Sequence, residues 1–186
     1  KVWDARTSKE VATLRGHDNS VESVAYSPDG KYIVSGSYGT IKVWDAQTYT
    51  GVATLTEHDV SVTSVAYSPD GKYIVSGIGS YGTINVWDAR ISKEVSTLPG
   101  HDYFVNSVAY SPDRKYIISG SDDKTIKVWD ARTSKEVATL RGHHGSVTSV
   151  AYSPDGKYII SGSDDKTIKV WDARTSKEVA TLRGHD

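Results

Sequence analysis

The sequence contains no cysteine and no methionine, and phenylalanine occurs once among its 186 residues. The absence of cysteine excludes disulfides, thiolate metal sites and cysteine nucleophiles, and it gives no support to an extracellular disulfide scaffold. Because methionine is missing even at position 1, we expect a fragment, a processed chain or the ordered part of a longer protein.

An excess of charge of one sign is also missing. The chain has 22 Lys and Arg against 23 Asp and Glu, and the basic residues recur one or two at a time among acids. Phosphate-binding surfaces need a local excess of Lys and Arg, so we expect neither a nucleic-acid nor a membrane partner. No apolar run approaches the roughly 18 residues of a membrane span, and no charged-then-apolar signal peptide is seen. We therefore predict a cytoplasmic protein.

Tryptophan marks an internal repeat, because it recurs at positions 3, 44, 87, 129 and 171, at intervals of 41, 43, 42 and 42 residues. A period of 42 divides the chain into four repeats with 18 residues left over. Residues 119–143 recur letter for letter at 161–185, and residues 1–18 recur at 169–186. The repeat, more than any single residue, therefore decides the fold.

Each repeat consists of short stretches rich in Val, Ile, Thr and Tyr, bounded by Gly, Pro, Asp or Ser, which is typical of strands between turns. No stretch has the apolar spacing of a helix. The sequence predicts an all-β protein with four antiparallel strands in each repeat. The turn Ser27-Pro28-Asp29-Gly30 recurs, but Arg114 replaces its glycine in the third copy. A left-handed backbone at Arg114 would cost on the order of 1 kcal/mol.

A four-stranded unit with apolar residues on both faces buries them only by stacking between neighbours. The order of motifs in each repeat, GH, SPDG, SGS and TIKVWD, resembles the Trp-Asp (WD) repeat β-propeller family, of the highly repetitive tandem-repeat type, over essentially the whole chain. The resemblance implies propeller blades. These are a half blade of third and fourth strands at 1–18, blade 1 at 19–60, blade 2 at 61–102, blade 3 at 103–144 and blade 4 at 145–186.

The resemblance also implies a hydrogen-bonded set of His, Ser, Asp and Trp in each blade. The matching residues are His17, Ser35 and Trp44; His58, Ser76 and Trp87; His101, Ser119, Asp123 and Trp129; and His143, Ser161, Asp165 and Trp171. In the first two blades Tyr38 and Tyr81 stand in place of the aspartate, and Glu57 replaces the glycine before the histidine of blade 2. We expect those two blades to lack the full network.

The same His, Ser and Asp residues allow a second interpretation, as a catalytic Ser-His-Asp site or a histidine metal site. Catalytic sites are single features on a scaffold, whereas these residues repeat with it. We therefore predict a structural network, no enzyme activity, no metal and no cofactor. The adjacent pair His143 and His144 is expected to be a network histidine followed by an exposed neighbour.

The repeats differ from one another mainly in the loop entering the first strand and in the turn before the third strand, which the family fold puts on one rim. Aromatic residues there favour binding, because they give large contact area at low entropic cost. The candidate partner-binding residues are Asn19, Glu22, Tyr38, Val60, Thr63, Tyr81, Tyr103, Phe104, Asn106 and His144. The alternative is that the aromatic residues pack between blades to offset missing network members, or reflect drift.

Two classes of function follow: a protein-interaction scaffold that binds a protein or peptide at this rim, as the family implies, or a propeller that binds a small ligand or glycan. The family usually closes its ring with seven or eight blades, so four blades leave an apolar flank exposed at each end. We expect a homodimer that forms one eight-bladed ring; the alternative is a fragment of a longer repetitive propeller. Of the two identical ends, one should be seated in a blade and the other displaced, swapped or poorly ordered.

Overall fold

The computed structural model describes residues 1–80 and 82–184, and the side chains of all of these except 57–59. Within that range the chain forms β-strands and no helix, so no helix able to cross a membrane is found there. The prediction of an all-β fold with antiparallel four-stranded blades is confirmed.

Blades 3 and 4 are separate four-stranded antiparallel sheets in which consecutive strands are neighbours. The strands of blade 3 are β9 (Val105–Tyr110), β10 (Tyr116–Ser121), β11 (Thr125–Asp130) and β12 (Glu136–Arg141). Those of blade 4 are β13 (Val147–Tyr152), β14 (Tyr158–Ser163), β15 (Thr167–Asp172) and β16 (Glu178–Arg183). The turns fall at the predicted Gly, Pro, Asp and Ser clusters.

Blades 1 and 2 share one continuous sheet. Its strands are β3 (Val21–Tyr26), β4 (Tyr32–Asp45), β5 (Gly51–Tyr67), β6 (Tyr73–Ile78), β7 (Thr83–Asp88) and β8 (Lys93–Pro99). β4 contains the second and third strands of blade 1, joined through a turn at Gly39 (φ 71°) that is one residue shorter than in blades 3 and 4. β5 serves as the last strand of blade 1 and the first of blade 2.

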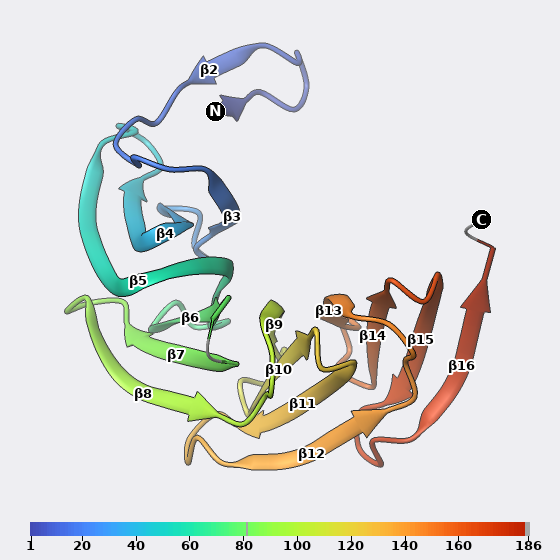
Figure 1. The fold of residues 1–186 in the computed structure, drawn as a ribbon. Coiled ribbons are helices and arrows are strands. Elements are labelled where there is room, and N and C mark those ends of the chain that lie inside the picture. The colour runs from blue at the N-terminus through green and yellow to red at the C-terminus, as the bar shows by residue number, and fades with distance from the viewer. Residues whose placement is uncertain (81, 185–186) are drawn as a thin grey trace.

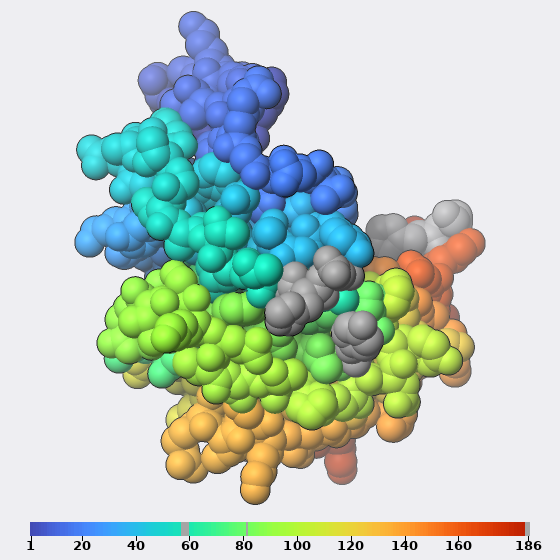
Figure 2. Space-filling model, turned by 60° about the vertical axis from the view of Figure 1, so that its left-hand side comes forward, coloured from blue at the N-terminus to red at the C-terminus, as the bar shows by residue number. Residues whose placement is uncertain are grey.

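The two identical ends of the sequence adopt different environments. Residues 169–183 lie within blade 4, where β15 pairs with β14 and β16. At the other end, β1 (Val2–Trp3) and β2 (Glu10–Ala12) form a separate two-stranded sheet, and Trp3 is 55% exposed. Figure 2 shows this half blade, in dark blue, projecting beyond blade 1. The C-terminal copy is therefore the one seated in a blade.

The blades follow one another around an open arc, with the half blade at one end and blade 4 at the other (Figure 1). The apolar core lies between blades, in three clusters, one at each junction of consecutive blades. At the first junction Val34 and Leu55 of blade 1 pack with Val62, Val65 and Trp87 of blade 2, all of them buried. The corresponding positions build the other two junctions, so each blade is completed by its neighbour.

The turn between the first two strands of each blade has the predicted conformation. Gly30, Gly71 and Gly156 have φ values of 70°, 71° and 71°, and Arg114 at the same repeat position has a φ of 67°. Arg114 is thus left-handed, although it is not a glycine. Arg114 Nη1 lies 3.4 Å from Asp70 Oδ2 of the preceding blade, so the side chain also forms an ion pair across the junction.

Candidate functional site

Blade 3 brings its predicted His, Ser, Asp and Trp together. His101 Nδ1 lies 2.7 Å from Asp123 Oδ2, and His101 Nε2 lies 2.7 Å from Ser119 Oγ. Because a carboxylate only accepts, Nδ1 carries the proton and Nε2 accepts from the serine hydroxyl. Trp129 Nε1 in turn donates to Ser119 Oγ at 2.9 Å. The network ties the entry loop, the second strand and the third strand into one unit.

Blade 4 repeats this network with nearly the same geometry. His143 lies 2.7 Å from Ser161 Oγ and 2.8 Å from Asp165 Oδ2, and Trp171 donates to the same serine at 2.9 Å. The repetition in two blades is what a structural network would show. Within the described residues, no group of three His, Asp or Glu side chains is arranged to hold a metal ion.

The carboxyl of Asp123 has a pKa below its ordinary value. Burial acts to raise the pKa, but hydrogen bonds from His101 and Thr125 outweigh it, because they stabilise the charged form. The pKa of Asp165 is lowered in the same way, against burial, by Thr167, the His144 backbone N–H and His143. Both aspartates are therefore held as anions that anchor the entry loop.

Blade 1 has a smaller network, as its sequence predicts. His17 Nε2 lies 2.7 Å from Ser35 Oγ, which also accepts from Trp44 Nε1 at 2.8 Å. In place of an aspartate, His17 Nδ1 faces Thr40 Oγ1 at 3.2 Å. Burial, followed by the nearby Lys42, lowers the pKa of His17. The neutral form of the His17 ring is thus favoured.

In blade 2 the structure describes part of the predicted network. Trp87 Nε1 donates to Ser76 Oγ at 3.0 Å, as the corresponding tryptophans do in the other blades. The His58 side chain and Tyr81 lie outside the described residues. Gly82 packs directly against the entry loop of blade 3. Its carbonyl accepts a hydrogen bond from His101 N at 3.2 Å, and a Cβ at Gly82 would lie 2.0 Å from His101 O, so only glycine fits there.

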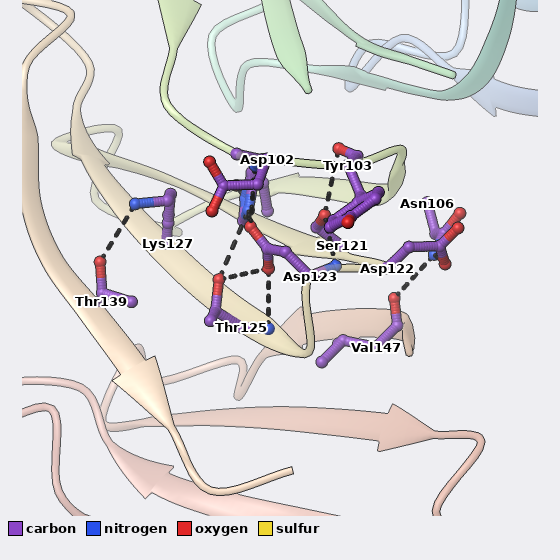
Figure 3. Close-up of polar contacts among 12 residues, drawn as sticks. Asp102, Tyr103, Asn106, Ser121, Asp122, Asp123, Thr125, Lys127, Thr139 and Val147 are labelled. Carbon is purple, nitrogen blue, oxygen red and sulfur yellow. Dashed lines mark hydrogen bonds and ion pairs between the residues drawn. The ribbon is translucent and has the colours of Figure 1, made fainter. Parts of the chain in front are cut away.

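The entry loop of blade 3 carries two exposed aromatic residues, and Figure 3 shows the hydrogen bond that holds one of them, Tyr103, to Ser121. Ser121 Oγ donates to the Tyr103 carbonyl at 3.2 Å, and Asp122 N donates to the Phe104 carbonyl at 3.0 Å. Asp102 N donates to Asp123 Oδ2 at 3.2 Å. Although their carbonyls are held, the Tyr103 and Phe104 residues are 63% and 49% exposed. The two aromatic residues are therefore exposed to solvent on a loop whose backbone is held by hydrogen bonds at three consecutive residues, 102–104.

The entry loop of blade 4 has the same backbone contacts without the aromatic side chains. Ser163 Oγ donates to the Gly145 carbonyl at 3.1 Å, and Asp164 N donates to the Ser146 carbonyl at 3.0 Å. Gly145 and Ser146 occupy the repeat positions of Tyr103 and Phe104. The two loops thus form a matched pair that differs in what it presents to solvent.

Three of the other predicted rim residues are engaged within the protein. Asn106 Nδ2 donates to Asp122 Oδ1 at 2.7 Å and to Val147 O of blade 4 at 3.2 Å. Thr63 donates to Gly77 O at 3.0 Å and also to Val105 O of blade 3. Val60 is buried, at 5% exposure, because β5 turns it into the core between blades 1 and 2, so its assignment to an exposed rim is corrected.

The remaining described candidates are exposed: Asn19, Glu22, Tyr38 and His144. Tyr38 pairs with Ser61 in the ladder between β4 and β5, so its backbone is fixed by blade 2. Asn19 and Glu22 lie on blade 1 and His144 on blade 4, on either side of the aromatic loop along the chain. The exposed candidate surface is thus distributed over the rim and is most apolar at blade 3.

Sequence comparison of repeats missed a set of serines that connect blades. Ser23, Ser64 and Ser107 accept hydrogen bonds from backbone N–H groups of the following blades, at Val65, Val108 and Val150, over 3.0, 3.1 and 3.1 Å. The sequence did indicate these serines, because the first strand of every repeat has a serine at this position. Positions that are identical in all repeats thus include the residues that connect neighbouring blades.

Comparison with known proteins agrees with this architecture. The family described as "WD domain, G-beta repeat" matches four times in succession, at residues 8–45, 50–88, 92–130 and 134–172. Among curated proteins no match was found. The four matches cover most of the chain, each ending at the Trp-Asp pair of a blade. The chain therefore belongs to the WD-repeat family.

Proposed function

We propose that the chain is a non-catalytic scaffold that presents its rim to a protein or peptide partner. The WD repeats indicate an interaction scaffold. The observation that carries the proposal is the exposed pair Tyr103 and Phe104 on a loop whose backbone is held by hydrogen bonds. A fixed aromatic surface binds with little loss of conformational entropy, and aromatic residues dominate interface energetics.

The entry loop of blade 4 supplies the control for testing this site. The double variant Tyr103→Gly with Phe104→Ser gives blade 3 the side chains of blade 4 on the backbone they already share. Peptides selected from a displayed random library against the unsubstituted chain should bind this variant at least about tenfold more weakly, as expected for the loss of one hot spot. The variant Gln47→Ala, at an exposed turn of blade 1 outside the candidate surface, should leave binding unchanged.

Two outcomes would contradict the rim proposal. One is full retention of peptide binding by the blade 3 double variant. The other is saturable binding on a glycan array that is lost in Tyr38→Ala, which would favour the glycan-binding alternative.

We further propose that two chains close into one eight-bladed ring. The support is that the open flanks carry the residues from which the internal junctions are built. Val24 of blade 1 is 66% exposed, whereas Val65, Val108 and Val150 at the same position are 5–6% exposed because a preceding blade covers them. At the other end, Leu182 of blade 4 is 53% exposed, against 0–1% for its three counterparts in blades 1–3.

The two open flanks also carry a complementary hydrogen-bond donor and acceptor. Ser149 is the repeat counterpart of the serines that accept from the next blade, and Val24 N is the counterpart of the N–H groups that donate to them. Joining blade 4 of one copy to blade 1 of another would extend the series of junctions. A head-to-tail contact of this kind forms a closed ring when its rotation closes.

Light scattering at micromolar concentration tests the ring. The expected mass is twice the chain mass of 20.3 kDa. A Val24→Glu variant should be monomeric, because it places a charge on the flank without disturbing the three internal junctions. A single-chain mass for the unsubstituted protein would overturn the ring proposal.

A further inference from the structure

The flank of blade 1 faces the half blade of its own chain, and residues of both line one pocket. This pocket between the half blade and blade 1 is open to solvent on one side and has a volume of about 480 Å³. Val2, Trp3 and Leu14 line it from the half blade, while Val24 and Tyr26 are among the lining residues of blade 1. In Figure 1 the half blade continues the arc beyond blade 1, where a preceding blade would stand.

Residues 1–18 fill this position incompletely, because they form only two strands, β1 and β2, which correspond to the third and fourth strands of a blade. At complete junctions the second strand contributes Val34, Val75 and Ile118, which are fully buried against the next blade. The half blade has no counterpart of these residues. Val24 consequently stays exposed, although its counterparts at complete junctions are buried.

Blade 4 of a second copy would be a more complete occupant of the same flank. Its strands β15 and β16 contain the sequence of the half blade, since residues 169–186 repeat residues 1–18. In addition, β14 supplies Ile160, which is 43% exposed on the open flank and is the counterpart of Ile118. The two occupants thus share one binding sequence, and the second copy adds the strand that the half blade lacks.

We infer that the half blade and blade 4 of a second copy compete for the flank of blade 1, so that residues 1–14 must leave this flank before two chains join. The inference rests on the proposed ring. A tethered segment has a high effective concentration, so the half blade occupies the flank in dilute solution. A second copy displaces it as the chain concentration rises.

The competition lowers the apparent affinity between chains by the square of the fraction of molecules whose flank is free, because each of the two chains must free its flank. The half blade therefore keeps the arc open at low concentration, although the same sequence forms part of blade 4 at residues 169–186. A substitution that weakens the half blade on the flank of blade 1 should therefore favour the dimer without any change in the four blades.

The identical ends allow a test with one substitution at two places in the full chain. Leu14→Asp weakens the half blade on the flank, and Leu182→Asp places the same charge at the same repeat position of blade 4. Sedimentation over a range of concentrations should give Leu14→Asp a dimer Kd about a hundredfold lower than the unsubstituted chain, if the flank is free in about a tenth of molecules, because both chains must free a flank. Leu182→Asp should give a higher Kd.

A purely structural role for these leucines would shift both variants in the same direction. If Leu14→Asp associates no more tightly than the unsubstituted chain, the inference is overturned while the ring proposal stands. If Leu14→Asp associates more weakly, the half blade belongs to the interface, and the inference is likewise overturned. If neither the unsubstituted chain nor Leu14→Asp associates, the ring proposal fails and the inference falls with it. A Leu14→Asp chain that dimerises where the unsubstituted chain is monomeric supports the inference.

Discussion

Two serines at one repeat position differ in how their hydroxyl groups are satisfied. Ser121 Oγ donates to Tyr103 O and accepts from Asp123 N at 3.1 Å. Ser37 Oγ is buried and has no hydrogen-bond partner within the described residues, because blade 1 has the shorter turn and no aspartate. Ser37→Ala should therefore raise the free energy of unfolding by up to about 1 kcal/mol, whereas Ser121→Ala should lower it by about 1 kcal/mol.

Urea unfolding of the two alanine variants measures this difference directly. Each variant is the control for the other, since both remove one hydroxyl from a buried serine of the second strand. Equal destabilisation by both substitutions would contradict the prediction.

Asp123 and Asp165 make stability depend on pH. Their pKa values are lower in the folded chain than the ordinary value near 3.9, so the unfolded chain binds more protons in acid. Their contribution is present above about pH 4 and is lost as the pH falls further. Asp123→Asn should lower the free energy of unfolding at pH 7 by about 1–3 kcal/mol, with the difference from the unsubstituted chain shrinking below pH 4.

Urea unfolding at pH 7, 4 and 3 checks the prediction. Asp102→Asn, an exposed carboxyl in the same loop, is the control and should change the free energy of unfolding by less than about 0.5 kcal/mol. The prediction is wrong if the Asp123→Asn difference is as large at pH 3 as at pH 7.

At the scale of strands, local composition predicted most of the fold. The Ser-Pro-Asp turns, with Arg114 in blade 3 and Gly156 in blade 4 as the fourth residue, set where the first strand ends and the second begins, because Pro and Asp favour the backbone angles of tight turns. The continuous β4 and β5 were not predicted. Their continuity depends on pairing between Tyr38 and Ser61, which lie in different repeats. Sequence patterns within one repeat carry no information on such pairing.

The sequence likewise predicted part of the candidate site. Tyr103 and Phe104 stand out because two large side chains occupy a loop position that is Gly-Ser in the next blade. The burial of Val60 and the hydrogen bond from Asn106 to Val147 O depend on how neighbouring blades meet. Differences between repeats therefore identified the exposed aromatic residues but did not separate partner contacts from contacts between blades.

At the scale of the whole molecule, close approach of consecutive blades requires a glycine in each second strand. A Cβ at Gly36, Gly77 or Gly120 would lie 2.7, 2.9 or 2.6 Å from a valine methyl of the following blade. Within residues 1–184 no further blade packs on the outer face of blade 4, and a Cβ at Gly162 would meet its nearest atom, in Ser149, at 3.9 Å. The sequence keeps this glycine at the open flank although no close contact among the described residues requires it there.

Gly162→Ala therefore distinguishes a flank that is free from one that binds another copy. The single chain should fold with unchanged stability, because the added methyl group has room. In a ring, the methyl would meet the counterpart of Val147, which is Val21 of the second copy, and overpacking of about 1–3 kcal/mol would raise the dimer Kd about tenfold or more. Gly120→Ala is the matched control and should instead destabilise the single chain by a similar amount. Sedimentation and urea unfolding of both variants measure the two effects. If Gly162→Ala dimerises like the unsubstituted chain, the two open flanks do not meet as the internal junctions do.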